Sequence, residues 1–201
     1  MAFLDKFEKS VQTAHSFLCI SLDTDHGRIP EFLYSEEDPI FAFNKAIVHA
    51  TADLVCAFKL NLAFYESLGP GGWESFRKTV NFIPKKVMII ADGKRGDIGN
   101  TSKKYAATFF EYFKCDALTV NPYMGSDSIQ PFLQYKTKGI FFLCLTSNPG
   151  SQDFQRLEMK DEPLYMHVAK RVKSWNKSDN CGLVIGATHP HELGMLRKQC
   201  P

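Results

Sequence analysis

The sequence predicts an α/β fold built on a parallel sheet, and three observations lead to this prediction. Six short apolar segments alternate with helical patterns along the 201 residues, as in chains of βαβ units. The segments are continuously apolar, which is typical of strands covered on both faces. Polar side chains follow the strands where they end, at the edge where parallel α/β folds bind their ligands.

The expected strands are apolar runs of four to seven residues. They cover residues 17–22, 54–60, 86–91, 117–120, 139–145 and 182–185. Helical patterns are expected at residues 2–12, 40–50, 72–82, 101–113, 126–135, 164–175 and 192–198. Two long polar connections, 23–38 and 147–162, have the length of functional lids. No linker or low-complexity tract divides the chain, so residues 1–201 are expected to form one domain.

Two architectures fit this alternation, a closed (β/α)8 barrel and an open doubly wound sheet. The open sheet usually carries a glycine-rich phosphate loop after its first strand, but residues 23–27 read Asp-Thr-Asp-His-Gly. We therefore expect the TIM barrel. Such barrels typically need about 250 residues, and only six units are counted here, which leaves two open edges. The chain is thus expected to be a partial barrel.

Composition narrows the possible partners and compartment. The formal charge is 24 − 22 = +2, which gives no general attraction to nucleic acid or membrane. The six cysteines form no C-x-x-C pair and have neither disulfide-framework nor zinc spacing. No signal-peptide block and no apolar run of about 20 residues is present. We expect a cytoplasmic protein that binds neither nucleic acid nor membrane.

The segment 92–101 indicates a catalytic function. It reads Asp-Gly-Lys-Arg-Gly-Asp-Ile-Gly-Asn-Thr. Charges at a strand end must be paired or used, because unpaired burial costs several kcal/mol. Asp92, Lys94 and Asp97, with Lys59 one strand away, are expected to form an alternating charge array that keeps the ammonium protonated. Such an array suits a reaction that builds negative charge beside a proton donor. Asn100 or Thr101 is expected to cap the following helix.

The motif Asp92-x-Lys94-x-x-Asp97-Ile98-x-x-Thr101 resembles the signature of the orotidine 5′-phosphate decarboxylase family. Four further segments match at successive strand ends, in the order of the family's longer-insert branch. They are 21–23 (Ser-Leu-Asp), 58–61 (Phe-Lys-Leu-Asn), 119–123 (Thr-Val-Asn-Pro-Tyr) and 146–150 (Thr-Ser-Asn-Pro-Gly). The motif alone is shared with sugar-phosphate decarboxylases of the same barrel superfamily, whereas the ordered set is specific.

The resemblance implies a lyase that converts orotidine monophosphate to uridine monophosphate in pyrimidine biosynthesis, without metal or other cofactor. Lys94 would protonate C6 of the pyrimidine, and Asp92, held by Lys59 and Lys94, would face the departing carboxylate. Whether Asp92 strains the ground state or preorganises the field stays open.

Further implied roles concern substrate binding and assembly. Asp23, Lys59 and Asn61 would hold the ribose region, and Thr146 and Ser147 the pyrimidine. Asp97, Ile98 and Thr101 would reach into the partner's site of a homodimer. The family grips phosphate with loops after strands seven and eight, which have no counterpart before Pro201. We therefore expect a polypeptide that ends at Pro201 to be poorly folded and nearly inactive.

Other interpretations of the same residues remain open from the sequence. The charge array would also be consistent with a structural ion-pair network. A metal-dependent sugar-phosphate decarboxylase or epimerase would use the aspartates to hold Mg²⁺, and a Schiff-base enzyme would use a lysine. A non-catalytic nucleotide-binding fragment is the remaining alternative. The pair His189 and His191 lacks a third metal ligand at a usual spacing and is expected to be solvent-exposed.

Overall fold

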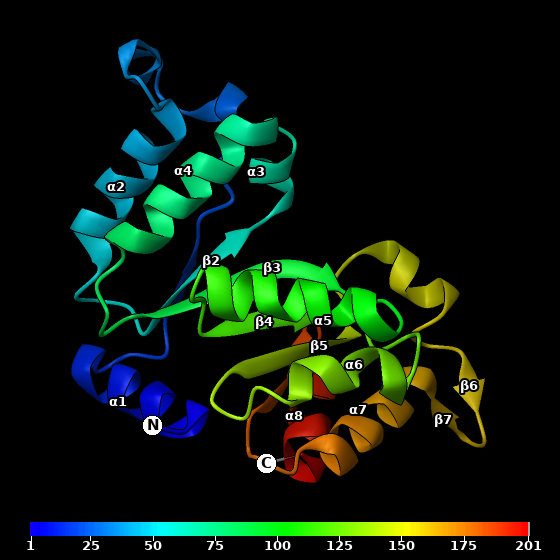
Figure 1. Ribbon diagram of the computed structural model, residues 1–201. Coiled ribbons are helices and arrows are strands. Elements are labelled where there is room, and N and C mark those ends of the chain that lie inside the picture. The colour runs from blue at the N-terminus through cyan, green and yellow to red at the C-terminus, as the bar shows by residue number, and fades with distance from the viewer. Residues whose placement is uncertain (201) are drawn as a thin grey trace. The chain divides into compact units, whose positions relative to one another are not determined.

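The computed structural model describes residues 1–200, in which strands and helices alternate (Figure 1). Six strands form one sheet in the order β1-β2-β3-β4-β5-β8. They are β1 (Cys19–Ser21), β2 (Ala57–Asn61), β3 (Met88–Arg95), β4 (Ala117–Val120), β5 (Gly139–Leu145) and β8 (Cys181–Ile185). The pairs β1–β2, β2–β3 and β5–β8 are parallel.

The strand order decides between the two predicted architectures. Within the sheet, the strands follow one another in chain order, whereas a doubly wound sheet reverses its order at a switch point. The order is therefore that of consecutive barrel units, as the sequence predicts. The predicted bounds 117–120 and 139–145 are those of β4 and β5, while β1 and β2 are shorter than predicted and β3 runs on to Arg95.

The described residues form two compact units. Unit 1 consists of residues 1–93 and 106–118, and unit 2 of residues 94–105 together with the described chain from Thr119 onward. The expectation of one domain over 1–201 stays a prediction. Strand β3 contributes to both units, so the segment that carries the predicted charge array is divided after Gly93.

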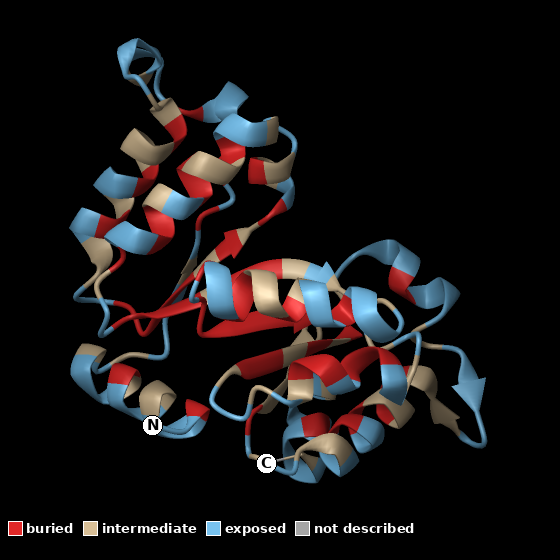
Figure 2. Cartoon of the chain, viewed as in Figure 1, coloured by how far each residue is buried: buried red, intermediate tan, exposed pale blue. Residues whose placement is uncertain are grey.

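Unit 1 contains four helices together with β1, β2 and the first part of β3. Its helices are α1 (Phe3–Ala14), α2 (Pro39–Thr51), α3 (Ala63–Glu66) and α4 (Gly69–Phe82). The buried positions of α2 and α4 lie on faces that turn toward each other (Figure 2). Asp38 begins α2 by accepting a hydrogen bond from the Phe41 amide at 3.0 Å, an N-cap that fits the Pro39 that follows it.

Helix α1 is attached to unit 1 by polar contacts as well as by packing. The Ser10 hydroxyl donates to the Cys56 carbonyl at 2.6 Å. Lys6 forms an ion pair with Asp116, whose other oxygen accepts from the Ile89 amide at 3.0 Å. These contacts tie a helix that precedes the first strand to the residues just before β2 and β4, and through Asp116 to the start of β3.

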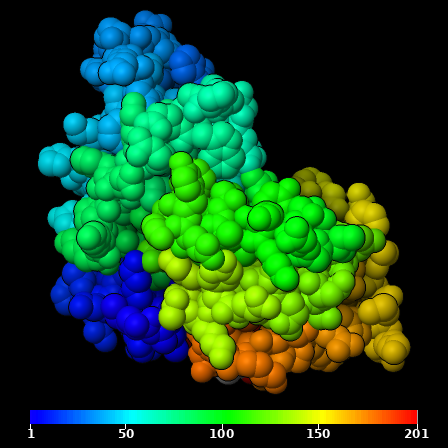
Figure 3. Space-filling view, viewed as in Figure 1, coloured from blue at the N-terminus to red at the C-terminus, as the bar shows by residue number. Residues whose placement is uncertain are grey.

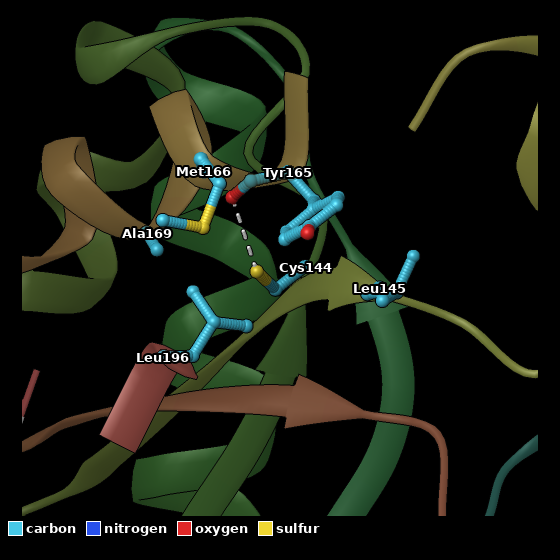
Figure 4. Packing of buried hydrophobic residues seen from close by; sticks show 6 residues of the cluster. All are labelled: Cys144, Leu145, Tyr165, Met166, Ala169 and Leu196. Atoms are coloured by element: carbon cyan, nitrogen blue, oxygen red, sulfur yellow. Dashed lines mark hydrogen bonds between the residues drawn. The ribbon is translucent and has the colours of Figure 1, made fainter. Parts of the chain in front are cut away.

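Unit 2 contains α5 (Gly99–Ala107), α6 (Ser126–Leu133), α7 (Leu164–Trp175) and α8 (Pro190–Gln199), with β5 and β8; the last residues of α5 belong to unit 1. Its buried cluster joins β5, α7 and α8 (Figure 4). The members are Cys144, Leu145, Tyr165, Met166, Ala169 and Leu196. The Cys144 thiol donates to the Tyr165 carbonyl at 3.3 Å, and burial raises the pKa of this thiol to about 12. Cys144 therefore serves as a small apolar core residue.

Several elements depart from the sequence prediction. The pattern 101–113 is helical but not uniform, because α5 gives way to a π-helical turn, Thr108–Tyr112. Short 3₁₀ turns occupy His26–Arg28, Glu31–Ser35 and Pro149–Asp153 in the two long connections. The second connection also forms an antiparallel hairpin of β6 (Glu158–Met159) and β7 (Glu162–Pro163), which lies at the surface (yellow in Figure 3).

Candidate active site

In unit 1 the predicted strand-end residues come together around Lys59. Its Nζ lies 2.9 Å from an Asp92 oxygen and 3.5 Å from an Asp23 oxygen. Asn61 Nδ2 lies 3.5 Å from the other Asp23 oxygen, and the Ser21 hydroxyl also donates to Asp23. Asp92 is only 8% exposed, so the ammonium compensates a carboxylate that would be costly to bury alone.

Strand register explains why these side chains meet. Lys59 pairs with Ser21 across β1–β2, and Asn61 pairs with Asp92 across β2–β3. Parallel strands in register bring their carboxyl ends to one edge of the sheet. Two residues apart on β2, Lys59 and Asn61 share a face of the sheet.

A buried polar network supports the Asp23 segment, and the sequence reasoning missed it. The Tyr65 hydroxyl donates to the Leu22 carbonyl at 3.2 Å, and Asn44 Nδ2 lies 3.0 Å from the Tyr65 oxygen. Asn44 also contacts Thr79 at 3.1 Å and accepts from the Thr24 hydroxyl. Burial raises the pKa of Tyr65, so the phenol remains a donor. No local sequence pattern links the four side chains of this network, which come from distant parts of the chain. They are Thr24, Asn44, Tyr65 and Thr79.

In unit 2, Lys94 lies on a backbone segment that is held on both sides. Its φ is +46°, a region that residues other than glycine rarely adopt. The Lys94 amide donates to the Thr119 hydroxyl at 3.0 Å, and the Asn121 amide donates to the Arg95 carbonyl at 2.8 Å. A Cβ on Gly96 would lie 2.8 Å from the Asn121 carbonyl oxygen. The turn thus depends on glycine at position 96. The regular alternation of side chains between the two faces of β3 does not extend to Lys94.

Asp97 and the start of α5 are arranged differently from the prediction. No ion pair joins Asp97 to another side chain within residues 1–200, so the structure does not bring it into the charge array. One Asp97 oxygen accepts from the Ile98 amide at 2.8 Å. Asn100 and Thr101 lie inside α5 and do not cap it. Instead the Ser102 oxygen accepts from the Asp97 amide at 3.2 Å.

Ile98 and Thr101 are both exposed, and the Ile98 side chain is 58% accessible. A large apolar side chain next to a predicted catalytic segment is available for contact with another molecule. Ser102 is buried, and its hydroxyl lies within hydrogen-bonding distance of the Asp97 and Ser128 carbonyls. This serine, which the sequence reasoning did not select, connects the loop to α6.

Thr146 and Ser147 follow β5, and the structure surrounds Thr146 with partners that the sequence did not reveal. Gln155 Oε1 accepts from the Thr146 amide at 2.7 Å. His189 Nε2 lies 3.1 Å from the Thr146 carbonyl oxygen. The prediction that His189 is solvent-exposed is wrong, because the ring is half-buried and bonded on both nitrogens. His191 is exposed, as predicted.

The ion pair between Arg156 and Glu192 contacts the His189 ring. Arg156 Nη2 lies 3.2 Å from His189 Nδ1 and 2.6 Å from a Glu192 oxygen. The hydrogen bond from Arg156 holds the pKa of the Glu192 carboxyl below its usual range. Helix α8 begins at Pro190, so this pair ties the first turn of α8 to the connection after β5.

Two further observations concern metals and membranes. Among residues 1–200, no three His, Cys, Asp or Glu side chains gather in a way that would hold a metal ion. Within the same range, no helix combines the length and apolar character that a bilayer crossing requires.

Comparison with known proteins gives one consistent result. The sequence profile described as "Orotidine 5'-phosphate decarboxylase / HUMPS family" matches residues 16–200. Orotidine 5′-phosphate decarboxylase of Herpetosiphon aurantiacus is 47% identical over 201 residues, which cover 99% of this chain and 75% of that protein. The enzyme of the same name from Phocaeicola vulgatus is 51% identical over 197 residues, 96% of this chain and 72% of that protein.

The fold agrees with the sequence relationship. The solved structure of Leishmania donovani OMP decarboxylase superposes with a TM-score of 0.90 at 37% identity, covering all of this chain and 77% of that one. The prediction of a TIM-barrel fold is confirmed. With a matching profile over nearly its whole length and relatives near half identity, the chain belongs to the orotidine 5′-phosphate decarboxylase / HUMPS family.

Proposed function

We propose that this protein converts orotidine 5′-monophosphate to uridine 5′-monophosphate and carbon dioxide, the last step of pyrimidine nucleotide synthesis. The observation that carries the proposal is the buried Asp92 carboxylate paired with Lys59 at a strand end, two residues before Lys94, in a chain of this family. The relatives that cover most of the chain have the same enzyme name.

The proposed chemistry uses side chains of the protein alone. The bond between C6 and the carboxyl carbon breaks, carbon dioxide leaves, and the electron pair remains at C6. Lys94 then delivers a proton from its ammonium to C6, where the proton stays, and the neutral lysine takes up a new proton from water. Asp92 faces the departing carboxylate, and Lys59 balances its charge. Fixed charges of this kind stabilise developing charge at no reorganisation cost during the reaction.

Substrate contacts are assigned to the remaining strand ends. Asp23, Lys59 and Asn61 offer carboxylate, ammonium and amide groups to the ribose hydroxyls. They already contact one another, so substrate would exchange with existing hydrogen bonds. Thr146 and Ser147 are assigned to the pyrimidine.

We further propose a cytoplasmic homodimer with shared active sites. Asp97 lacks a cationic partner within residues 1–200, and Ile98 exposes an apolar side chain beside it. Both features fit a loop that completes the site of a second copy, together with Thr101. No nucleic-acid or membrane partner is included in the proposal.

The absorbance of orotidine monophosphate tests the proposal directly. We expect the substrate band to disappear on addition of the full-length protein, with EDTA present. The variant Lys94→Ala should lose this activity, by at least about 10²-fold for a proton donor. Lys103→Ala removes an exposed lysine of α5 and is the matched control. Turnover of sugar phosphates that EDTA abolishes would favour the metal-dependent alternative, and trapping of a substrate adduct by borohydride would favour the Schiff-base alternative.

A further inference from the structure

We infer that three positioning residues hold the Thr146–Ser147 dipeptide in the fixed conformation in which it recognises the substrate's base. They are Gln155, Gly186 and His189. The inference rests on the proposed function, because it takes this dipeptide to be the part that meets the pyrimidine. The three positioning residues lie outside the dipeptide, and no sequence pattern connects any of them to the site.

Gln155 holds Thr146 through both ends of its amide. Its Oε1 accepts from the Thr146 backbone N–H at 2.7 Å, and its Nε2 donates to Thr146 Oγ1 at 2.8 Å. The Thr146 hydroxyl then donates to Asn148 Oδ1 at 2.6 Å. Each hydrogen bond from Gln155 through Thr146 to Asn148 therefore has a defined donor and a defined acceptor. A bidentate contact of this kind fixes both the backbone and the χ1 angle of Thr146.

His189 holds the opposite side of the same peptide. A carbonyl oxygen only accepts and a guanidinium only donates. The contacts of Nε2 with the Thr146 carbonyl and of Nδ1 with Arg156 therefore require the hydrogen on Nε2 of a neutral ring. Glu192, at 2.6 Å from Arg156, keeps the guanidinium in place. Both backbone polar groups of Thr146 are consequently bonded to side chains rather than to a neighbouring strand.

Gly186 restricts Ser147 by close contact. A Cβ at position 186 would lie 2.8 Å from Ser147 N and 2.9 Å from Ser147 Cβ. The Gly186 amide also donates to the Leu145 carbonyl at 2.7 Å, so the chain after β8 cannot move away without losing this bond. Only glycine allows this approach, and any larger residue must displace Ser147.

The two residues of the dipeptide therefore differ in their hydrogen bonding. The polar groups of Thr146 are all bonded to protein partners, whereas those of Ser147 are available to a ligand. Ser147 is exposed, and within residues 1–200 neither its amide nor its hydroxyl has a protein hydrogen-bond partner. A fixed N–H donor beside a hydroxyl suits a ring that presents a carbonyl and an N–H along one edge. Holding such groups in place raises discrimination, because misplacement by about 1 Å can cost 10²-fold in rate.

The test compares ligands with and without the base. Dissociation constants for uridine monophosphate and for ribose 5-phosphate are measured calorimetrically on Gln155→Leu, His189→Leu and Gly186→Ala, together with kcat and KM. We expect uridine monophosphate to bind about 10- to 100-fold more weakly, while binding of ribose 5-phosphate changes less than about twofold. Loss of turnover without loss of base-dependent affinity would contradict the inference.

Matched controls are available in the same segments. Gln152→Leu and His191→Leu change exposed residues of the same types and should behave as wild type. His189→Gln should restore binding, since its Nε2 can donate to Thr146 as the ring does. Equal weakening of both ligands would show a merely structural role and overturn the inference. A wild-type protein that binds no uridine monophosphate would instead overturn the proposed function, and this inference with it.

Discussion

Lys94 combines the ammonium proposed as the proton donor with a backbone conformation that lysine rarely adopts. Its φ of +46° and the two hydrogen bonds that flank it place local strain at the residue proposed to deliver the proton. Strain of this kind persists only where surrounding structure enforces it, and it clusters at functional sites. The side chain is therefore aimed by the fold and not by the regular pleat of β3.

The strain can be measured by comparing two truncations. At an ordinary position glycine is less stable than alanine, but in the left-handed region alanine carries a penalty of about 1 kcal/mol. We expect Lys94→Gly to have a higher free energy of unfolding than Lys94→Ala in urea titrations, with both variants inactive. If alanine proves the more stable of the two, residue 94 does not have a left-handed backbone in solution.

The Lys59–Asp92 pair allows a second test at the residue scale. Lys59→Met removes the ammonium 2.9 Å from a buried carboxylate and should lower the free energy of unfolding by about 1.5–3 kcal/mol. Adding Asp92→Asn should recover much of this loss but not the activity, because the charge itself is gone. Additive effects in this double-mutant cycle would mean that the two side chains do not interact.

Single residues also show how far sequence reasoning reaches. Lys59, Asn61 and Asp92 could be placed together because strand ends of a parallel sheet share one edge. Asp97 was assigned to the same array because it is near in sequence, but no ion pair joins it to another side chain among residues 1–200. His189 and Gln155 act on Thr146 through contacts across 43 and 9 residues, and no local pattern encodes such hydrogen bonds.

At the scale of elements, burial on both faces made the strands predictable. The runs of β4 and β5 have the bounds that the sequence predicted, since no charged residue interrupts them. The π-helical turn at Thr108–Tyr112 and the β6–β7 hairpin were missed. Their residues follow ordinary helical and loop patterns, and their conformation depends on tertiary contacts.

Helices α3 and α4 offer a matched pair of glycine substitutions. A Cβ on Gly72 would lie 1.8 Å from the Tyr65 carbonyl oxygen, whereas one on Gly71 would meet nothing within 4 Å. Gly72→Ala should therefore destabilise the protein by about 1–3 kcal/mol through overpacking. Gly71→Ala should stabilise it by up to about 1 kcal/mol through helix propensity. Urea unfolding distinguishes the two, and equal effects would argue against the close α3–α4 contact.

At the scale of the whole molecule, the proposed dimer predicts complementation. If Asp97 of one copy completes the site that contains Lys94 of the other, mixing Lys94→Ala with Asp97→Ala creates one intact site in each mixed dimer. Random exchange of subunits should then restore about a quarter of wild-type activity, as expected for a symmetric pair.

The matched control mixes Lys94→Ala with Asp92→Asn. Both changes affect the same copy's share of the site, so no intact site forms and no activity should return. Recovery in the control, or none in the first mixture, would contradict a shared site. Activity is followed by the absorbance of orotidine monophosphate, and sedimentation gives the dimer fraction in each sample.

The chain from Lys94 to Asp97 is anchored at both ends, by Thr119 and Asn121 on one side and by Ser102 on the other. Ordering a backbone costs roughly 1–2 kcal/mol of entropy per residue, and an anchored loop incurs this cost once, when the chain folds. Each turnover would then begin with Lys94, the proposed proton donor, already in position. The entropic part of the barrier, which grows with absolute temperature, is thereby kept out of the chemical step.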